Sequence, residues 1–242
     1  MIPLRDNIPS RGPSYGVWLI IILNTAIFLL QLSLNERELL RFTYIFGMVP
    51  ARATDPAWAQ WVGYSPDWAM TMVTHMFLHS GWLHFLLNMW MLWIFGDNVE
   101  DVMGPLRFLL FYLLCGLGAI LLHLLFNLGS TIPVIGASGA IAGVMGAYLL
   151  LYPHAKVVAL VPIFFLPYFF EVPAVIFLGI WFLIQILSGI FSLVFTGMGS
   201  GIAWWAHIGG FIAGIALVRL FQKHGTCRHC TTLEQWFRDH SR

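Results

Sequence analysis

Apolar residues fill long stretches of the chain that contain no Asp, Glu, Lys or Arg. These charge-free tracts cover residues 12–35, 68–96, 108–155 and 172–218. One helix needs about 20 apolar residues to cross a bilayer, so each of the last two tracts has room for two crossings. The pattern predicts six membrane-spanning helices, at residues 16–34, 82–103, 106–128, 138–152, 172–193 and 204–221.

The segments between these helices favour an all-α membrane protein with one domain. Residues 35–80 are polar and rich in Trp and Pro, which is typical of a large structured loop at the membrane interface. The segment before the fifth helix contains Pro162, Pro167 and Pro173, and we expect a loop there. Residues 1–15 then form an N-terminal segment, residues 16–222 the six-helix domain, and residues 223–242 a polar tail.

Composition excludes several other classes of protein. Hydrophobic residues make up 59% of the chain, against 12 Lys and Arg and 11 Asp and Glu, so an ordinary soluble domain is excluded. The net charge of +1 leaves no basic face for nucleic acid, so we expect no such partner. The lipid bilayer is the expected surrounding.

The distribution of Lys and Arg predicts the orientation. With six crossings both termini share one side, and cationic residues are concentrated there, which favours cytoplasmic termini and an outward-facing first loop. Arg37, Arg41 and Arg52 lie on the opposite side. The terminal side holds Arg5, Arg11, Arg107, Lys156, Arg219, Lys223, Arg228, Arg238 and Arg242. The N-terminus has no arginine-rich amphipathic stretch, so we expect a bacterial plasma membrane. No small-residue cleavage site follows the first apolar run, so we expect the first helix to be retained.

Four polar residues within the predicted spans are the candidates for chemistry, because polar side chains are costly in a bilayer. His84 and Asn88 lie one turn apart in the second helix, Ser138 begins the fourth, and His207 lies in the first turn of the sixth. All three helices run inward from the outer side. The four side chains are therefore expected at one shallow depth.

Small residues flank two of these candidates and predict close helix packing. Gly139 and Gly143 follow the serine, and Gly210 and Gly214 follow the histidine in GxxxG spacing. If the two helices pack through these faces, the serine hydroxyl and the imidazole come within hydrogen-bond reach, as a base-activated nucleophile requires. Neither helix carries a carboxylate near this site, so the pattern predicts a Ser–His dyad.

Donors for a developing oxyanion are expected at the same depth. Ser138 at a helix start has a free backbone N–H at the positive end of the helix dipole. His84 and Asn88 add side-chain N–H groups. These are the parts that acyl transfer needs.

On these residues the sequence resembles the rhomboid family of intramembrane serine proteases. The resemblance rests on His84-x-x-x-Asn88, Gly136-Ala-Ser138-Gly139 and Ala206-His207-x-x-Gly210-x-x-x-Gly214, with Asp97 to Gly104 similar to a Glu-containing turn of the family. It covers about residues 74–218. It implies a six-helix fold, Ser138 as nucleophile, His207 as general base, and an oxyanion held by His84, Asn88 and the Ser138 N–H. It also implies cleavage of single-pass membrane proteins near the outer surface, without a cofactor.

The chain departs from the family pattern at two places. Many relatives carry an aromatic residue one turn after the serine, stacked on the histidine, where this chain has Ala142. The orientation of the His207 ring is therefore left open. A Trp-Arg pair of the family's first loop is replaced by Met70-Thr71.

Other functions and sites stay open as alternatives. A proteolytically inactive relative could bind or escort membrane-protein clients, and a transporter could line a path with polar residues. His75, His79 and His84 are not expected to hold a metal because no carboxylate or thiol joins them. Cys227 and Cys230 in the tail could bind zinc, but the second ligand pair is missing. The oligomeric state is not predicted.

Overall fold

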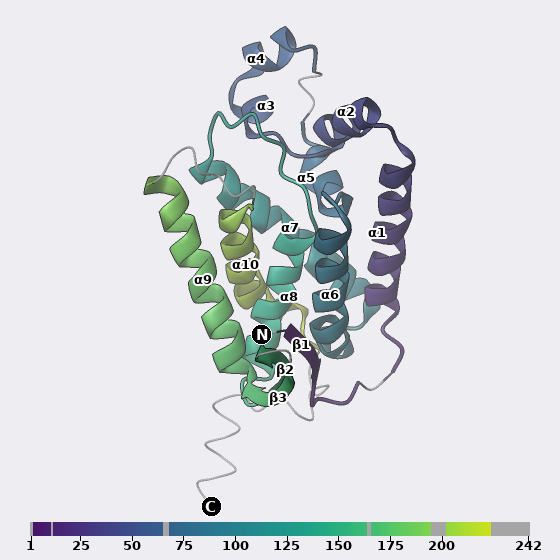
Figure 1. Cartoon of the computed structure of the whole chain (residues 1–242), viewed down its shortest axis with the longest axis vertical. Helices are drawn as coiled ribbons and strands as arrows, with labels where there is room; N and C mark the ends of the chain where they lie inside the picture. The colour runs from purple at the N-terminus through teal and green to yellow at the C-terminus, as the bar shows by residue number, and fades with distance from the viewer. Residues whose placement is uncertain (1, 11, 65–67, 164–165, 195–201, 224–242) are drawn as a thin grey trace, which may run out of the picture.

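The fold is a bundle of long helices with short helices at one end and a small sheet at the other (Figure 1). The computed structural model describes residues 2–10, 12–64, 68–163, 166–194 and 202–223. A helix occupies each of the six expected ranges, with ends shifted by a few residues. These are α1 (Tyr15–Ser33), α6 (Trp82–Met103), α7 (Pro105–Phe126), α8 (Ser138–Leu151), α9 (Ala174–Val194) and α10 (Trp204–Phe221).

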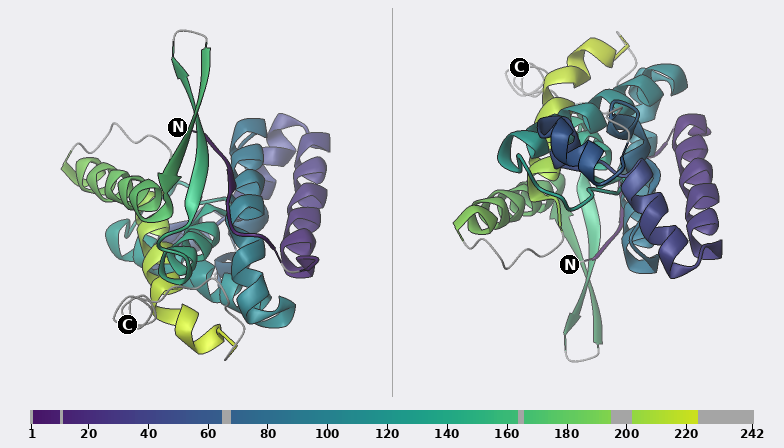
Figure 2. Two further views of the ribbon diagram at one scale, coloured as in Figure 1. Left: turned by 90° about the horizontal axis from the view of Figure 1, so that it is seen from below. Right: turned by 90° about the horizontal axis from the view of Figure 1, so that it is seen from above.

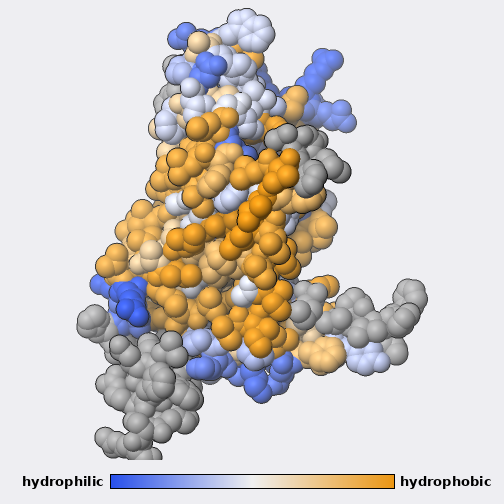
Figure 3. All heavy atoms as spheres, turned by 90° about the vertical axis from the view of Figure 1, so that its left-hand side faces the viewer, coloured by the Kyte–Doolittle hydropathy of each residue, from blue (hydrophilic) through white to orange (hydrophobic). Residues whose placement is uncertain are grey.

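Four of these helices are long and apolar enough to cross a membrane by themselves. Within the described part of the chain they are α1, α7, α9 and α10. Helix α8 has only 14 residues, and the last two turns of α6 contain Asp97, Glu100 and Asp101. A broad apolar band covers the face in Figure 3, with hydrophilic residues gathered above and below it. This banding is what a bilayer requires of a protein surface.

Short helices make up the segment that follows α1. They are α2 (Glu36–Phe46), α3 (Pro50–Thr54), α4 (Pro56–Trp61), α5 (Thr71–Thr74) and the 3-10 helix η1 (His75–Phe77). Helix α2 begins with a capping box: the Asn35 side chain accepts from the N–H of Glu38, whose carboxylate accepts from the N–H of Asn35. Gln31 of α1 hydrogen-bonds both the N–H and the C=O of His79, so the segment is also tied down where it meets α6.

Glycines bring three helices into backbone contact at the centre of the bundle. A Cβ added at Gly210 would collide with the carbonyl oxygen of Gly139, and one at Gly214 with that of Gly143. Two glycines of α8 also leave room for α7, since a Cβ on Gly139 would meet the side chain of Ala119 and one on Gly143 that of Cys115. Helices α8 and α10 thus pack closely, and α7 is a third partner.

The chain is mostly helical, as expected, but it also forms a three-stranded antiparallel sheet that the all-α expectation did not include. The strands are β1 (Ile2–Asp6), β2 (Lys156–Ile163) and β3 (Leu166–Pro173), in the order β1-β2-β3. The segment expected to be a proline loop is therefore a hairpin, which projects from the bundle in both views of Figure 2. Part of the N-terminal segment, Ile2–Asp6, is a strand as well.

Proline has no N–H to donate to a neighbouring strand, and the prolines of this sheet lie near strand ends or in an edge strand, where few such bonds are lost. Pro162 pairs with Pro167 close to the turn of the hairpin, and Pro173 is the last residue of β3. Pro3 is in the edge strand β1. Val157, Val158 and Val161 supply the β-branched residues that favour strands.

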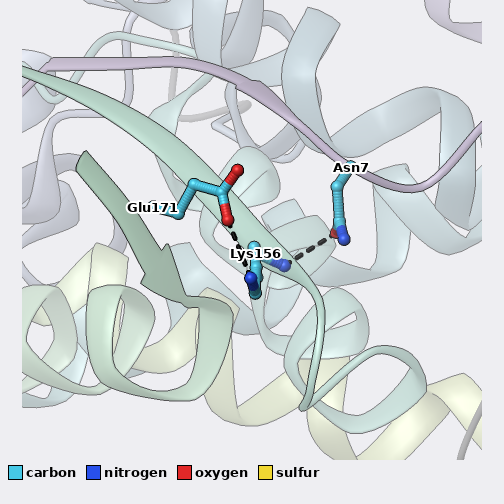
Figure 4. Close-up of polar contacts among 3 residues, drawn as sticks. All are labelled: Asn7, Lys156 and Glu171. Carbon is cyan, nitrogen blue, oxygen red and sulfur yellow. Dashed lines mark hydrogen bonds and ion pairs between the residues drawn. The ribbon is translucent and has the colours of Figure 1, made fainter. Parts of the chain in front are cut away.

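Polar side chains fasten the strands to one another and to the bundle. The Lys156 ammonium lies 2.8 Å from a Glu171 carboxylate oxygen across the hairpin, and the Lys156 N–H donates to the Asn7 amide oxygen (Figure 4). The Asp6 carboxylate accepts from the Tyr148 hydroxyl of α8 at 2.5 Å and from the Asn98 amide of α6 at 2.9 Å. The N-terminal strand is therefore attached to the helix that begins with Ser138.

Glu100 ties α6 to the start of α1. Its two carboxylate oxygens accept from the N–H groups of Gly16 and Val17, each at 2.8 Å. These are unpaired donors at the positive end of α1, so a buried carboxylate is well accommodated there. Glu100 is therefore a structural hydrogen-bond acceptor near the C-terminal end of α6.

Enlarging one glycine of the α8–α10 contact should separate the two helices. We expect Gly210→Ala to lower the free energy of unfolding by about 1–3 kcal/mol, because the new methyl group meets the Gly139 carbonyl oxygen. Thermal unfolding in detergent measures the effect. The control is Gly179→Ala in α9, where nothing lies within 4 Å of the added Cβ. Equal stability of the two variants would contradict the close contact.

Asp6 should make stability fall as the pH rises. Burial raises the pKa of Asp6 from 3.8 to about 6, against the opposing effect of the Tyr148 hydrogen bond. The folded state then binds this proton more tightly than the unfolded state, so the free energy of unfolding decreases between about pH 4 and pH 6. Asp6→Asn should reduce that slope in unfolding measured across this range. An unchanged slope would contradict the assignment.

Candidate active site

Ser138 and His207 are in contact. The Ser138 Oγ lies 2.8 Å from the His207 Nε2, between the first residue of α8 and the first turn of α10. The serine side chain makes no capping bond at the start of α8, where Ala137 is the N-cap residue. The simplest alternative for this serine, a helix cap, is therefore not what its hydroxyl does.

The segment before α8 is hydrogen-bonded to residues of the region that contains the short helices. Val134 and Met48 exchange two backbone hydrogen bonds, at 3.0 and 2.8 Å, and the Gly136 N–H donates to the His75 carbonyl at 2.9 Å. Gly136 has a φ of +126°, and a Cβ there would lie 2.7 Å from the His84 Nε2. Only glycine fits this position, because the backbone conformation and the imidazole both exclude a side chain.

His84 lies near the serine without a hydrogen bond to it, and Asn88 lies one turn further along α6. The His84 Nδ1 is 3.0 Å from the Ser80 hydroxyl, and its Nε2 faces Gly136. The Asn88 amide donates to the His84 carbonyl one turn back at 2.7 Å. Within the described residues neither side chain hydrogen-bonds Ser138. The structure thus joins the serine and the histidine, places His84 near the serine, and shows Asn88 bonded only within α6.

A third residue that the sequence analysis missed contacts the histidine. The His207 Nδ1 lies 2.8 Å from the Gln185 Oε1 of α9, and the Gln185 side chain is 4% exposed. The available signal was a glutamine within an otherwise apolar stretch of the fifth helix, since polar residues there are costly. The pairing itself depends on how α9 packs against α10.

Aromatic rings from two helices pack near the His207 ring. The centroid of the Trp181 ring lies 5.9 Å from the imidazole at 34°, and the Trp204 ring lies 6.2 Å away at 90°. Ala142 itself is fully buried in α8. The ring orientation that the sequence left open is therefore given by Gln185 and by these two tryptophans.

The other histidines near the site have structural partners. The His75 Nδ1 lies 2.8 Å from the Thr71 carbonyl, and the His79 ring packs against Phe85 with centroids 5.4 Å apart. Among the described residues, no three His, Cys, Asp or Glu side chains are grouped as a metal site. Cys227 and Cys230 lie outside the described residues.

A comparison with known protein families matches the part of the chain that carries these residues. A family model described as the rhomboid domain matches residues 66–224. The chain belongs to the rhomboid family. The match contains Ser138, His207, His84 and Asn88, and together with the apolar helices it makes this rhomboid an integral membrane protein.

Relatives of this rhomboid come from organelles and from a bacterium. Rhomboid protein 1, mitochondrial, of Saccharomyces cerevisiae is 28% identical over 60% of this chain and 40% of its own length. RHOMBOID-like protein 6, mitochondrial, of Arabidopsis thaliana is 41% identical over 38% of this chain and 29% of its own length. Rhomboid protease GluP of Bacillus subtilis is 41% identical over 32% of this chain and 15% of its own length. The chain thus matches less than half the length of each of these relatives.

Proposed function

We propose that this rhomboid is an intramembrane serine endopeptidase that uses a Ser138–His207 dyad. The observation that carries the proposal is the 2.8 Å contact between the serine Oγ and the histidine Nε2. A serine hydroxyl is a weak nucleophile unless a base takes its proton, and hydrogen-bond contact with an imidazole is the arrangement that allows this. The protease named among the relatives supports the same reaction.

The proposed reaction is acyl transfer in two steps. The Ser138 oxygen attacks the carbonyl carbon of the scissile bond while its proton passes to the His207 Nε2. The protonated imidazole then gives this proton to the leaving amine, and an ester to Ser138 remains. In the second step His207 takes a proton from water, whose oxygen replaces the serine at the carbonyl carbon. The acid product leaves, and the protonated His207 returns its proton to the Ser138 oxygen, which restores the serine hydroxyl.

Three donors are proposed for the oxyanion. The Ser138 N–H is at the first position of α8 and has no partner within the helix. The His84 imidazole and the Asn88 amide come from α6. The added Cβ of Gly136 would meet both the His84 ring and, at 3.7 Å, the Ser138 Oγ, which supports the His84 assignment. Donors that reach the substrate oxygen stabilise the negative charge that develops on it.

We propose six membrane crossings, made by α1, α6, α7, α8, α9 and α10. Two of them would not cross a bilayer alone, since α6 carries charged residues in its last turns and α8 is short. Helix α8 spans about 21 Å, less than the hydrocarbon core of about 30 Å, so Ser138 would lie below the outer surface. Residues 16–222 are proposed as the protease domain, with residues 1–15 and 223–242 on the cytoplasmic side. The first loop would then face outward, as the Lys and Arg distribution favours.

The proposed substrates are single-pass membrane proteins cut close to the outer side of the bilayer. A serine at this depth would meet a peptide bond only in a segment that enters the membrane and unwinds there. No cofactor is needed for the proposed steps. A bacterial plasma membrane stays a prediction, since the relatives named above come from mitochondria as well as from a bacterium.

Replacing the serine should abolish proteolysis. We expect Ser138→Ala to lower kcat for a model single-pass substrate in liposomes by at least about 10⁴-fold, because the nucleophile is lost. The control is Ser33→Ala, which removes an exposed hydroxyl at the end of α1. Normal cleavage by a folded Ser138→Ala variant would contradict the proposal. Wild-type protein that binds such substrates but never cuts them would favour an inactive, client-binding rhomboid instead.

Asn88 should affect turnover more than binding. If its amide contacts the oxyanion, Asn88→Ala should lower kcat about 10²-fold and change KM by less than about threefold. Initial rates over a range of substrate mole fractions in liposomes give both constants. Equal losses in kcat and in affinity would instead indicate that Asn88 only supports α6 through its bond to the His84 carbonyl.

A further inference from the structure

Gln185 makes the second hydrogen bond to the imidazole of the proposed base. Its Oε1 lies 2.8 Å from the His207 Nδ1, on the side of the ring opposite the serine. The side chain is 4% exposed and comes from α9, whereas the serine and the histidine come from α8 and α10. Within the described residues no carboxylate contacts this ring, so an amide occupies the place that an acid holds in a three-residue site.

The hydrogen bonds determine which way the Gln185 amide points. Its Nε2 donates to the Trp181 carbonyl, one turn back in α9, at 3.1 Å. In the flipped orientation the amide oxygen would face that carbonyl oxygen and the amide N–H₂ would face the imidazole. The contact between the two oxygens is repulsive, so the Gln185 Oε1 must be the atom that faces His207.

An amide oxygen can only accept a hydrogen bond, and this decides the tautomer of the ring. The His207 Nδ1 must carry the hydrogen that points to Gln185, so the Nε2 has a free lone pair directed at the Ser138 hydroxyl. In the other tautomer the Nε2 would itself donate to the serine oxygen and could not take its proton. The Gln185 contact therefore selects the form of the ring that can act as a base.

We propose that Gln185 is a positioning residue that holds His207 in the tautomer and orientation needed to accept the Ser138 proton. The proposal rests on the protease function inferred above and adds a third member to the site. A neutral acceptor also remains in place after proton transfer, because the Nδ1–H of the imidazolium still donates to the same oxygen. Trp181 and Gln185 thus link α9 to the reacting pair.

Two substitutions distinguish the effect of the acceptor oxygen from the effect of the size and shape of the side chain. Gln185→Met keeps the length but has no oxygen, and we expect kcat to fall about tenfold or more while KM stays within about twofold. Gln185→Glu keeps an oxygen at this place and should regain most of the loss. Cleavage of a single-pass substrate in liposomes measures both. Wild-type kcat in Gln185→Met, or equal losses in Gln185→Met and Gln185→Glu, would overturn the proposal.

The matched control is the same substitution at another buried glutamine. Gln31 of α1 is 3% exposed and braces the His79 backbone without touching the reacting pair. We expect Gln31→Met to lower the melting temperature without a selective loss of kcat. If it reproduces the kcat and KM pattern of Gln185→Met at equal loss of stability, then Gln185 acts only by stabilising the fold and the proposal is wrong.

A readout that does not depend on proteolysis keeps this proposal distinct from the proposed function. In protein labelled with ¹⁵N-histidine, the His207 signals are assigned by their loss in His207→Ala. We expect a protonated Nδ1 and an unprotonated Nε2 in the wild type at neutral pH, and loss of this preference in Gln185→Met. The reverse tautomer in the wild type would refute the role of Gln185. Cleavage by Ser138→Ala would refute the protease assignment, whatever the tautomer.

Discussion

Contact between the backbones of α8 and α10 is the constraint on which the rest of the site depends. Gly210 and Gly214 lie so close to the carbonyl oxygens of Gly139 and Gly143 that no side chain fits between the two helices. In a bilayer, small residues allow such contact and the van der Waals packing that stabilises it. The hydroxyl of Ser138 and the ring of His207 meet because the helices that carry them are this close.

The residues of the site come from four different helices. Helix α8 supplies the serine, α10 the histidine, α9 the glutamine behind the histidine, and α6 the candidate oxyanion donors. The segment before α8 is hydrogen-bonded to Met48 and His75. Near the other end, Asp6 joins the N-terminal strand to Tyr148 of the same helix. Helix α8 is thus held at both ends.

Sequence patterns predicted the parts of the molecule that depend on local composition. The charge-free tracts located the long helices, since a run of apolar residues reports length and burial directly. Ser138 and His207 could be paired because each is followed by glycines at helical spacing. These features lie within one helix, or in two helices with matching patterns.

Features that depend on contacts between distant segments were missed. The hairpin at residues 156–173 contains three prolines, which led to the expectation of a loop, and Ile2–Asp6 pairs with it from the far end of the chain. Gln185 belongs to no motif, and its partner is set by how α9 packs on α10. The orientation of the His207 ring likewise follows from Trp181 and Trp204, which no local pattern connects to it.

Covalent labelling of the serine tests the central claim most directly. A fluorophosphonate probe reacts with a serine only where a base activates its hydroxyl, so the folded protein in detergent should be modified at Ser138, as located by mass spectrometry of the labelled peptide. The His207→Ala variant, shown to be folded by its melting curve, should lose this labelling. Modification of another residue, or labelling of His207→Ala at the wild-type rate, would contradict the account.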